Sequence, residues 1–169
     1  PDTDRLIAQG EYVVNVIAGE VQITKKLTET SDKDQTFIFT IKKDGLVYKT
    51  VTLTVPANAT QATYAGEDLK NLARGEYLVA EALTDGYAIK EFSIGEGTNC
   101  KSSKNESEET ATFTMGLNKA GKDVIAEADY ESGILGQAIY TNEKVIKDWN
   151  IKKVSSSDPK LVLANAQFK

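Results

Sequence analysis

The chain contains no histidine and only one cysteine, Cys100, among its 169 residues. Without histidine, it lacks the usual general base near neutral pH and the commonest metal ligand. This composition excludes a Ser-His-Asp triad, a Cys-His pair and a zinc site, and we expect no metal and no cofactor. A single cysteine cannot form an internal disulfide, so a covalent cross-link within the chain would require other chemistry.

Long apolar runs and an excess of basic residues are also missing. No stretch approaches the roughly 20 apolar residues of a membrane-spanning helix, and the opening PDTDRLIAQG does not resemble a signal peptide. The formal net charge of −5 argues against a nucleic-acid partner, because no basic patch is available to neutralise phosphates. We therefore expect neither nucleic-acid binding nor membrane insertion, and an exported protein would contain this chain as a mature fragment.

Alternating apolar and polar residues, separated by turn-forming Gly, Asp and Asn, dominate the sequence. This period-two pattern predicts strands, over residues 19–28, 36–43, 48–56, 75–83, 86–94, 109–117 and 136–146. The stretch GEDLKNLA predicts a helical turn or two. About seven short strands with this punctuation indicate an all-β fold, an antiparallel immunoglobulin-like β-sandwich.

The stretch CKSSKNESEET, residues 100–110, is polar and poor in apolar side chains. This composition is typical of an exposed, mobile loop. We expect Cys100 to be an incidental thiol in that loop, rather than half of a thioester.

Two charged residues fall on the apolar face of predicted strands. In EYLVAEALTDGY, residues 76–87, alternation places Glu81 on the same side as Tyr77 and Val79. In GEVQITKKLT, residues 19–28, the same rule places Lys25 on the side of the apolar residues. A carboxylate and an amine are therefore both predicted to face the core, where charged groups are rarely found.

The two ends of the chain resemble each other. EYVVNVIAGEVQITKKL near the start can be laid over AIYTNEKVIKDWNIKKV near the end: each has a strand that ends in Asn, then a linker, then a strand that ends in a Lys pair. Such a repeat indicates tandem domains. We predict that residues 1–18 close a preceding repeat, 19–146 form a complete domain, and 147–169 open a following repeat.

Three stretches, in this order, carry a family resemblance: VQITKKLTETSDKDQTFIFTI, GEYLVAEALTDGY and AIYTNEK. The chain resembles the isopeptide-linked, immunoglobulin-like repeats of Gram-positive pilins and surface adhesins, a group that contains the collagen-adhesin B-type domains and pilin linkage domains. The tail IKKVSSSDPKLVLANAQFK is similar to the opening of another B-type domain.

The resemblance implies a self-made cross-link. In such domains, a lysine of the first strand and an asparagine of the last condense into an amide with loss of ammonia, assisted by a nearby acid. Carried over to this chain, Lys25 would be the nucleophile, Asn142 the electrophile and Glu81 the catalytic proton shuttle. Asn15 and Lys153 would be half-sites of neighbouring repeats. Because the reaction consumes its own residues, the protein would not be a turnover enzyme.

The implied function is structural: a stalk or shaft domain of a pilin or adhesin, outside the cell and attached to the cell wall. Its partners would be neighbouring repeats or pilus subunits, with a host surface ligand as a further candidate. Other interpretations stay open. Lys26 would face the core after a bulge, Glu81 would be a surface acid, and Asn142 would begin a turn. The alternative function is an extracellular ligand-binding β-sandwich without a cross-link.

Overall fold

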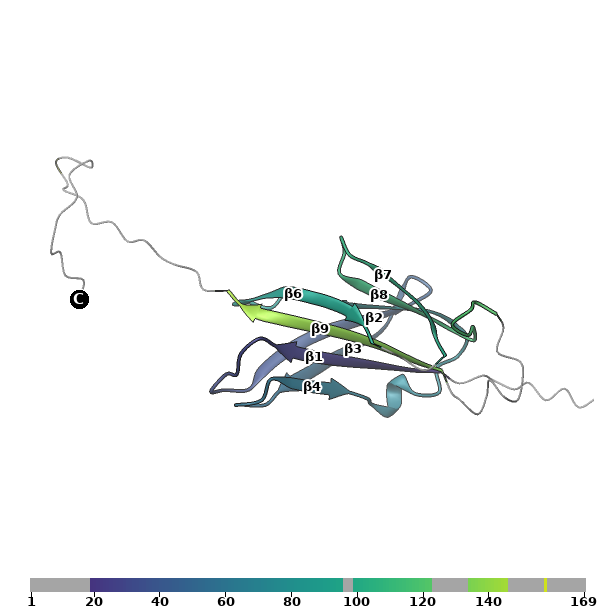
Figure 1. Ribbon diagram of the computed structural model, residues 1–169, viewed down its shortest axis with the longest axis horizontal. Coiled ribbons are helices and arrows are strands. Elements are labelled where there is room, and N and C mark those ends of the chain that lie inside the picture. The colour runs from purple at the N-terminus through teal and green to yellow at the C-terminus, as the bar shows by residue number, and fades with distance from the viewer. Residues whose placement is uncertain (1–18, 96–98, 123–133, 146–156, 158–169) are drawn as a thin grey trace, which may run out of the picture.

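Nine strands and one short 3-10 helix make up the described part of the chain (Figure 1). The computed structural model describes residues 19–95, 99–122, 134–145 and 157. The strands are β1 (Glu20–Leu27), β2 (Gln35–Lys43), β3 (Leu46–Val55), β4 (Gln61–Tyr64), β5 (Gly75–Glu81), β6 (Tyr87–Ile94), β7 (Lys101–Asn105), β8 (Thr110–Met115) and β9 (Leu135–Lys144). The helix is η1 (Glu67–Leu69).

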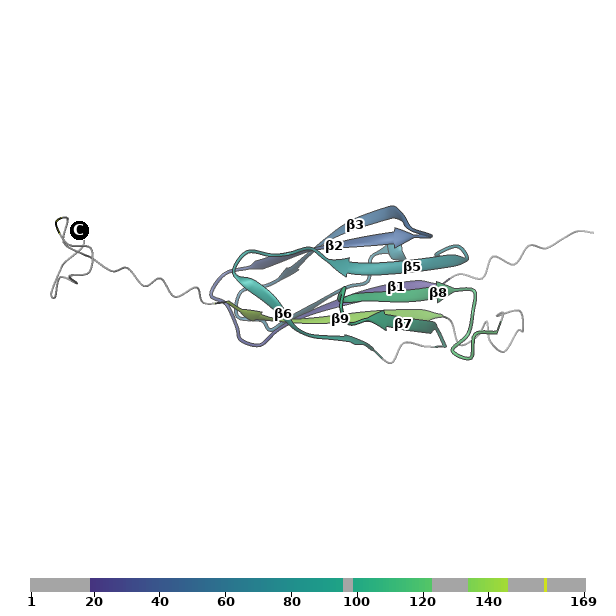
Figure 2. The same ribbon diagram turned by 90° about the horizontal axis from the view of Figure 1, so that it is seen from above.

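The strands form two sheets that pack face to face (Figure 1, Figure 2). One sheet has the order β4-β1-β9-β6 and the other the order β3-β2-β5-β8-β7. All neighbouring strands are antiparallel except β1 and β9, which run side by side in the same direction. This arrangement confirms the predicted immunoglobulin-like β-sandwich.

All seven predicted strands are present, and GEDLKNLA contains the predicted helical turn as η1. Two strands were not predicted. β4 has only four residues, QATY, too few to establish an alternating pattern. β7 lies in the stretch expected to be a loop, and that prediction was wrong: its backbone pairs with β8 from Lys101↔Thr114 to Asn105↔Thr110. All five β7 side chains are exposed, as expected for an edge strand held by main-chain hydrogen bonds rather than side-chain packing.

The core lies between the two sheets and follows the predicted alternation. In β1, the side chains of Val21, Ile23 and Leu27 are buried, whereas Lys26 is exposed. Large aromatic residues from both sheets meet in the middle; Phe39 and Tyr140 have ring centroids 5.3 Å apart. Burying such apolar surface is the main favourable term in folding, at about 25 cal/mol per Å².

The strand directions give the sandwich two distinct ends. β1, β5 and β9 begin at one end, here called the near end, and finish at the other, here called the far end. The far end also carries the loops formed by residues 28–34, 56–60, 82–86 and 106–109. No helix in the described residues is long and apolar enough to cross a bilayer.

Candidate functional site

Three strands bring the predicted site residues together near the far end. β1 and β9 are parallel neighbours, with Lys25 opposite Tyr140 and Leu27 opposite Asn142. Asn142 is therefore the diagonal neighbour of Lys25 on the inner face of the same sheet. Glu81 is the last residue of β5, which belongs to the other sheet. The site thus joins two adjacent strands of one sheet to the facing sheet.

The Glu81 carboxylate contacts both other residues. Lys25 Nζ donates to Glu81 Oε2 at 2.7 Å and to Oε1 at 2.9 Å. Asn142 Nδ2 donates to the same Oε1 at 2.6 Å. A single carboxylate oxygen therefore holds the amine and the amide side by side, inside the sandwich.

The three side chains are removed from solvent. Lys25 is 0% exposed and Asn142 2% exposed, and the Glu81 side chain is 1% exposed. Phe37 adds to the enclosure, with its ring centroid 4.4 Å from Lys25 Nζ. The cation over this aromatic face partly replaces the lost hydration of the amine.

Burial moves the two ionisable groups toward their neutral forms. Desolvation lowers the pKa of Lys25 to about 8, although the charge and hydrogen bond of Glu81 act in the opposite direction. Desolvation also raises the pKa of Glu81, although Lys25 and the Asn142 amide act to lower it. Because the two pKa values approach each other, moving the proton from Lys25 to Glu81 costs far less here than in water.

The Asn142 carbonyl oxygen is left without a donor. Asn142 Oδ1 is the buried side-chain oxygen for which the described residues supply no hydrogen-bond partner. The 2.6 Å contact of the Asn142 amide with Glu81 is also shorter than a usual N–H···O bond and matches an O–H···O bond. Turning the amide by 180° would place Oδ1 on a protonated Glu81, and the two orientations are distinguished only by the hydrogen bonds they make.

The structure decides between several placements that the sequence left open. Lys26 is exposed and β1 contains no bulge, so Lys25 is the lysine that faces the core. Glu81 is not a surface acid, and Asn142 lies within β9 rather than at the start of a turn. Asn15 and Lys153 lie outside the described residues, as do residues 1–18 and almost all of 147–169.

Residues that the sequence did not single out complete the surroundings. The Tyr140 hydroxyl lies 2.9 Å from the carbonyl oxygens of both Val79 and Glu109, and so links β9 to the facing sheet. Burial raises the Tyr140 pKa. In β6, a bulge between Ile89 and Glu91 falls opposite Asn142 and Thr141. No sequence pattern signals such a bulge, although bulges often re-aim side chains beside functional sites.

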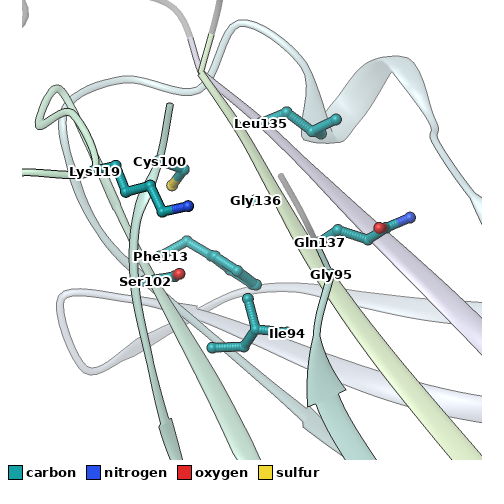
Figure 3. A pocket seen from close by; sticks show the side chains of 9 residues that line it. All are labelled: Ile94, Gly95, Cys100, Ser102, Phe113, Lys119, Leu135, Gly136 and Gln137. Atoms are coloured by element: carbon teal, nitrogen blue, oxygen red, sulfur yellow. The ribbon is translucent and has the colours of Figure 1, made fainter. Parts of the chain in front are cut away.

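Cys100 was expected in an exposed loop, and that prediction was wrong. It is 6% exposed and lies just before β7, where it lines a cavity of about 40 Å³ at the near end. Figure 3 shows Cys100 and Lys119 on one side of this cavity and Gln137 on the other. Burial raises the Cys100 pKa to about 11, which keeps the thiol protonated and unreactive near neutral pH.

No cluster of three or more metal-binding side chains is found in the described ranges. Comparison with protein-family models and with curated proteins gave no significant match. The geometry of the Lys25, Glu81 and Asn142 side chains is therefore the main guide to function.

Proposed function

We propose that this protein is a structural stalk domain that cross-links itself through an amide between Lys25 Nζ and the side-chain carbonyl carbon of Asn142. The observation that carries the proposal is the shared contact of both residues with one buried carboxylate, at 2.9 Å and 2.6 Å from the same oxygen. Burying a lysine, an acid and an asparagine together costs desolvation free energy that their mutual contacts only partly offset, so the fold gains little stability from the three side chains as they stand.

The reaction begins with a proton transfer. Lys25 passes a proton to Glu81, which leaves a neutral amine able to act as a nucleophile. The lowered pKa of Lys25 and the raised pKa of Glu81 both favour this step. Protonated Glu81 can then donate to Asn142 Oδ1 and polarise the carbonyl, once the amide has turned.

Bond formation is balanced without any external reagent. Lys25 Nζ attacks the Asn142 carbonyl carbon, and Glu81 carries the proton of the amine to the departing amide nitrogen. The C–N bond to Nδ2 breaks and ammonia leaves, while the new C–N bond joins β1 to β9. Groups held in contact by the fold gain effective molarities on the order of 10⁵ M or more, which makes a slow amide exchange feasible.

The position of the bond suits a load-bearing element. The chain passes into β1 at the near end and out of β9 at the far end, and the two strands are parallel neighbours. Tension on the chain would therefore run along β1 to Lys25, cross to Asn142 and leave along the last residues of β9. The segment between them would carry no load. By analogy with disulfides closing loops of about 100 residues, the bond would stabilise the fold by about 5 kcal/mol.

The resemblance to pilin and adhesin repeats agrees with this use. It suggests a location outside the cell, on the cell wall of a Gram-positive bacterium, with neighbouring repeats or pilus subunits as partners. Such a domain would be a single-turnover device rather than an enzyme.

Pulling on single molecules tests the mechanical role. In this experiment the wild-type chain is attached at residues 19 and 145 and stretched. We expect its contour length to increase very little on unfolding, because the cross-link carries the force past residues 25–142. A Glu81→Ala variant should release the length of the whole sandwich. Equal length gains in the two proteins would contradict the proposal.

A further inference from the structure

A second cavity, of about 230 Å³, adjoins the cross-linking site at the far end. Its lining combines apolar residues with two glutamates and an asparagine. The lining residues are Glu81, Ala82, Leu83, Thr84, Tyr87, Ala88, Ile89, Glu109 and Asn142. A cavity with aliphatic walls and carboxylates matches the two parts of an alkylammonium chain: methylenes and a terminal cation.

Glu109 has an unusual backbone. Among the described residues other than glycine, five have a positive φ: Asp44, Asn58, Asn71, Asn99 and Glu109. The other four are Asp or Asn, whose short side chains tolerate this left-handed conformation, whereas a glutamate does not gain from it. Glu109, with φ 53°, therefore stores strain on the order of 1 kcal/mol.

The fold holds Glu109 in place despite this strain. Its carbonyl oxygen accepts a hydrogen bond from the Tyr140 hydroxyl at 2.9 Å, and the next residue, Thr110, begins β8. Strained residues of this kind concentrate at ligand sites, where the conformation aims a needed side chain. Glu109 lines the cavity, so the side chain that this backbone conformation would serve is the Glu109 carboxylate.

The loops of the far end are rich in acidic residues, although one of them, Glu106, is paired with Lys104 of β7. These four loops contain a single lysine, Lys33, against seven acidic residues: Glu29, Asp32, Asp34, Asp85, Glu106, Glu108 and Glu109. A surface with one dominant charge sign steers oppositely charged partners toward it. Leu83, which lines the cavity, is fully exposed and offers an apolar contact to a partner.

We propose that this cavity binds a lysine side chain presented by a second polypeptide. The methylenes would lie against Leu83, Ala88 and Ile89, and the ammonium would approach the Glu109 carboxylate. Binding is non-covalent and depends on the cavity rather than on the cross-link.

A titration of the 169-residue protein followed by NMR tests this site. The probe is Nα-acetyllysine methylamide, and its matched control is the same compound acetylated at Nε, which is neutral. We expect saturable shifts of the Ala82, Leu83, Ala88 and Ile89 methyl signals with the charged probe, and about tenfold weaker binding of the neutral form, the loss expected for one charge-assisted hydrogen bond.

Variants separate the cavity from the general acidity of the far end. Glu109→Gly should relieve the strained backbone, keep the fold and lower affinity about tenfold, whereas Glu108→Gln should leave it unchanged. Absence of saturable shifts, or equal affinity in the Glu109→Gly protein, would overturn the inference. The mass of the same sample reports the cross-link separately, so the two proposals succeed or fail independently.

Discussion

Two lysine–carboxylate pairs in this protein have nearly the same geometry and opposite surroundings. Lys25 Nζ lies 2.7 Å from a Glu81 oxygen, and Lys49 Nζ lies 2.8 Å from an Asp68 oxygen. Each carboxylate has a further donor, the Asn142 amide in the first pair and the Tyr64 hydroxyl in the second. The Lys25 and Glu81 side chains are 0% and 1% exposed, whereas those of Lys49 and Asp68 are 43% and 33% exposed.

Burial, rather than distance, determines what each pair can do. Desolvation lowers the Lys25 pKa to about 8, while the hydrogen bond and charge of Asp68 raise the pKa of Lys49. The hydrogen bond from Lys49 is also the largest of the effects that lower the Asp68 pKa. The exposed pair is therefore held in its charged form, and the buried pair is poised to exchange a proton. Of these two lysines, Lys25 is the one that can act as a nucleophile near neutral pH.

Removing the carboxylate should have the largest effect in the buried pair. Glu81→Ala should prevent cross-linking and leave Lys25 buried without a partner. We expect a loss of unfolding free energy of roughly 5 kcal/mol from the missing bond and a further 3–5 kcal/mol from the unpaired charge. Guanidinium unfolding measures the change. Asp68→Ala is the matched control and should change stability little; a similar loss in both variants would contradict the comparison.

The pH dependence of stability should have opposite signs in the two pairs. In an Asn142→Ala protein, which cannot cross-link, the folded state holds fewer protons on Lys25 than the unfolded state between pH 8 and 10.5. Stability should therefore rise with pH across this window, by on the order of 3 kcal/mol in total. Lys49, with a raised pKa, contributes stability at lower pH that is lost as pH rises through its folded value.

The reference for this pH measurement is the Asn142→Ala protein that also carries Lys25→Met and Glu81→Gln. Both proteins contain Cys100 and the tyrosines, so titration of those groups cancels in the difference. Unfolding free energies measured between pH 8 and 10 give that difference. A difference that falls with rising pH, or does not change, would be inconsistent with a depressed Lys25 pKa.

Two tyrosine hydroxyls extend the comparison to hydrogen bonds. Tyr140→Phe should cost about 1–3 kcal/mol, because the buried carbonyl oxygens of Val79 and Glu109 would lose their shared donor. Tyr64→Phe removes a donor from the partly exposed Asp68, where water can replace it, and should cost less. Thermal unfolding of both variants compares the two losses of stability. A loss for Tyr64→Phe as large as that for Tyr140→Phe would contradict the role given to burial.

The smallest effect is expected for the exposed lysine next to the site. Lys26→Met should leave the cross-link and the stability close to those of the wild type, because Lys26 points away from Glu81. Intact mass after denaturation is the readout. A Lys26→Met protein whose mass equals the calculated value, with no loss of ammonia, would show that Lys26, not Lys25, is the reactive residue.

Alternation was sufficient to predict most of the sandwich and the inward direction of Lys25 and Glu81. It was sufficient because a period of two assigns every residue of a long strand to one face. It failed for β7, whose five polar residues are held by main-chain pairing to β8, and for the burial of Cys100 beside that strand. The strained backbone of Glu109 and the bulge opposite Asn142 depend on tertiary contacts, so no local pattern indicates them.

The intact mass of the purified, denatured chain, followed by tandem mass spectrometry of its proteolytic fragments, shows whether Lys25 and Asn142 are cross-linked. If the cross-link forms, the measured mass is lower than the calculated mass by one ammonia, Lys25 and Asn142 lie in one branched peptide, and Glu81→Ala has the full calculated mass. A wild-type mass equal to the calculated value would show that the three side chains meet without forming a bond, and the proposed function would be wrong.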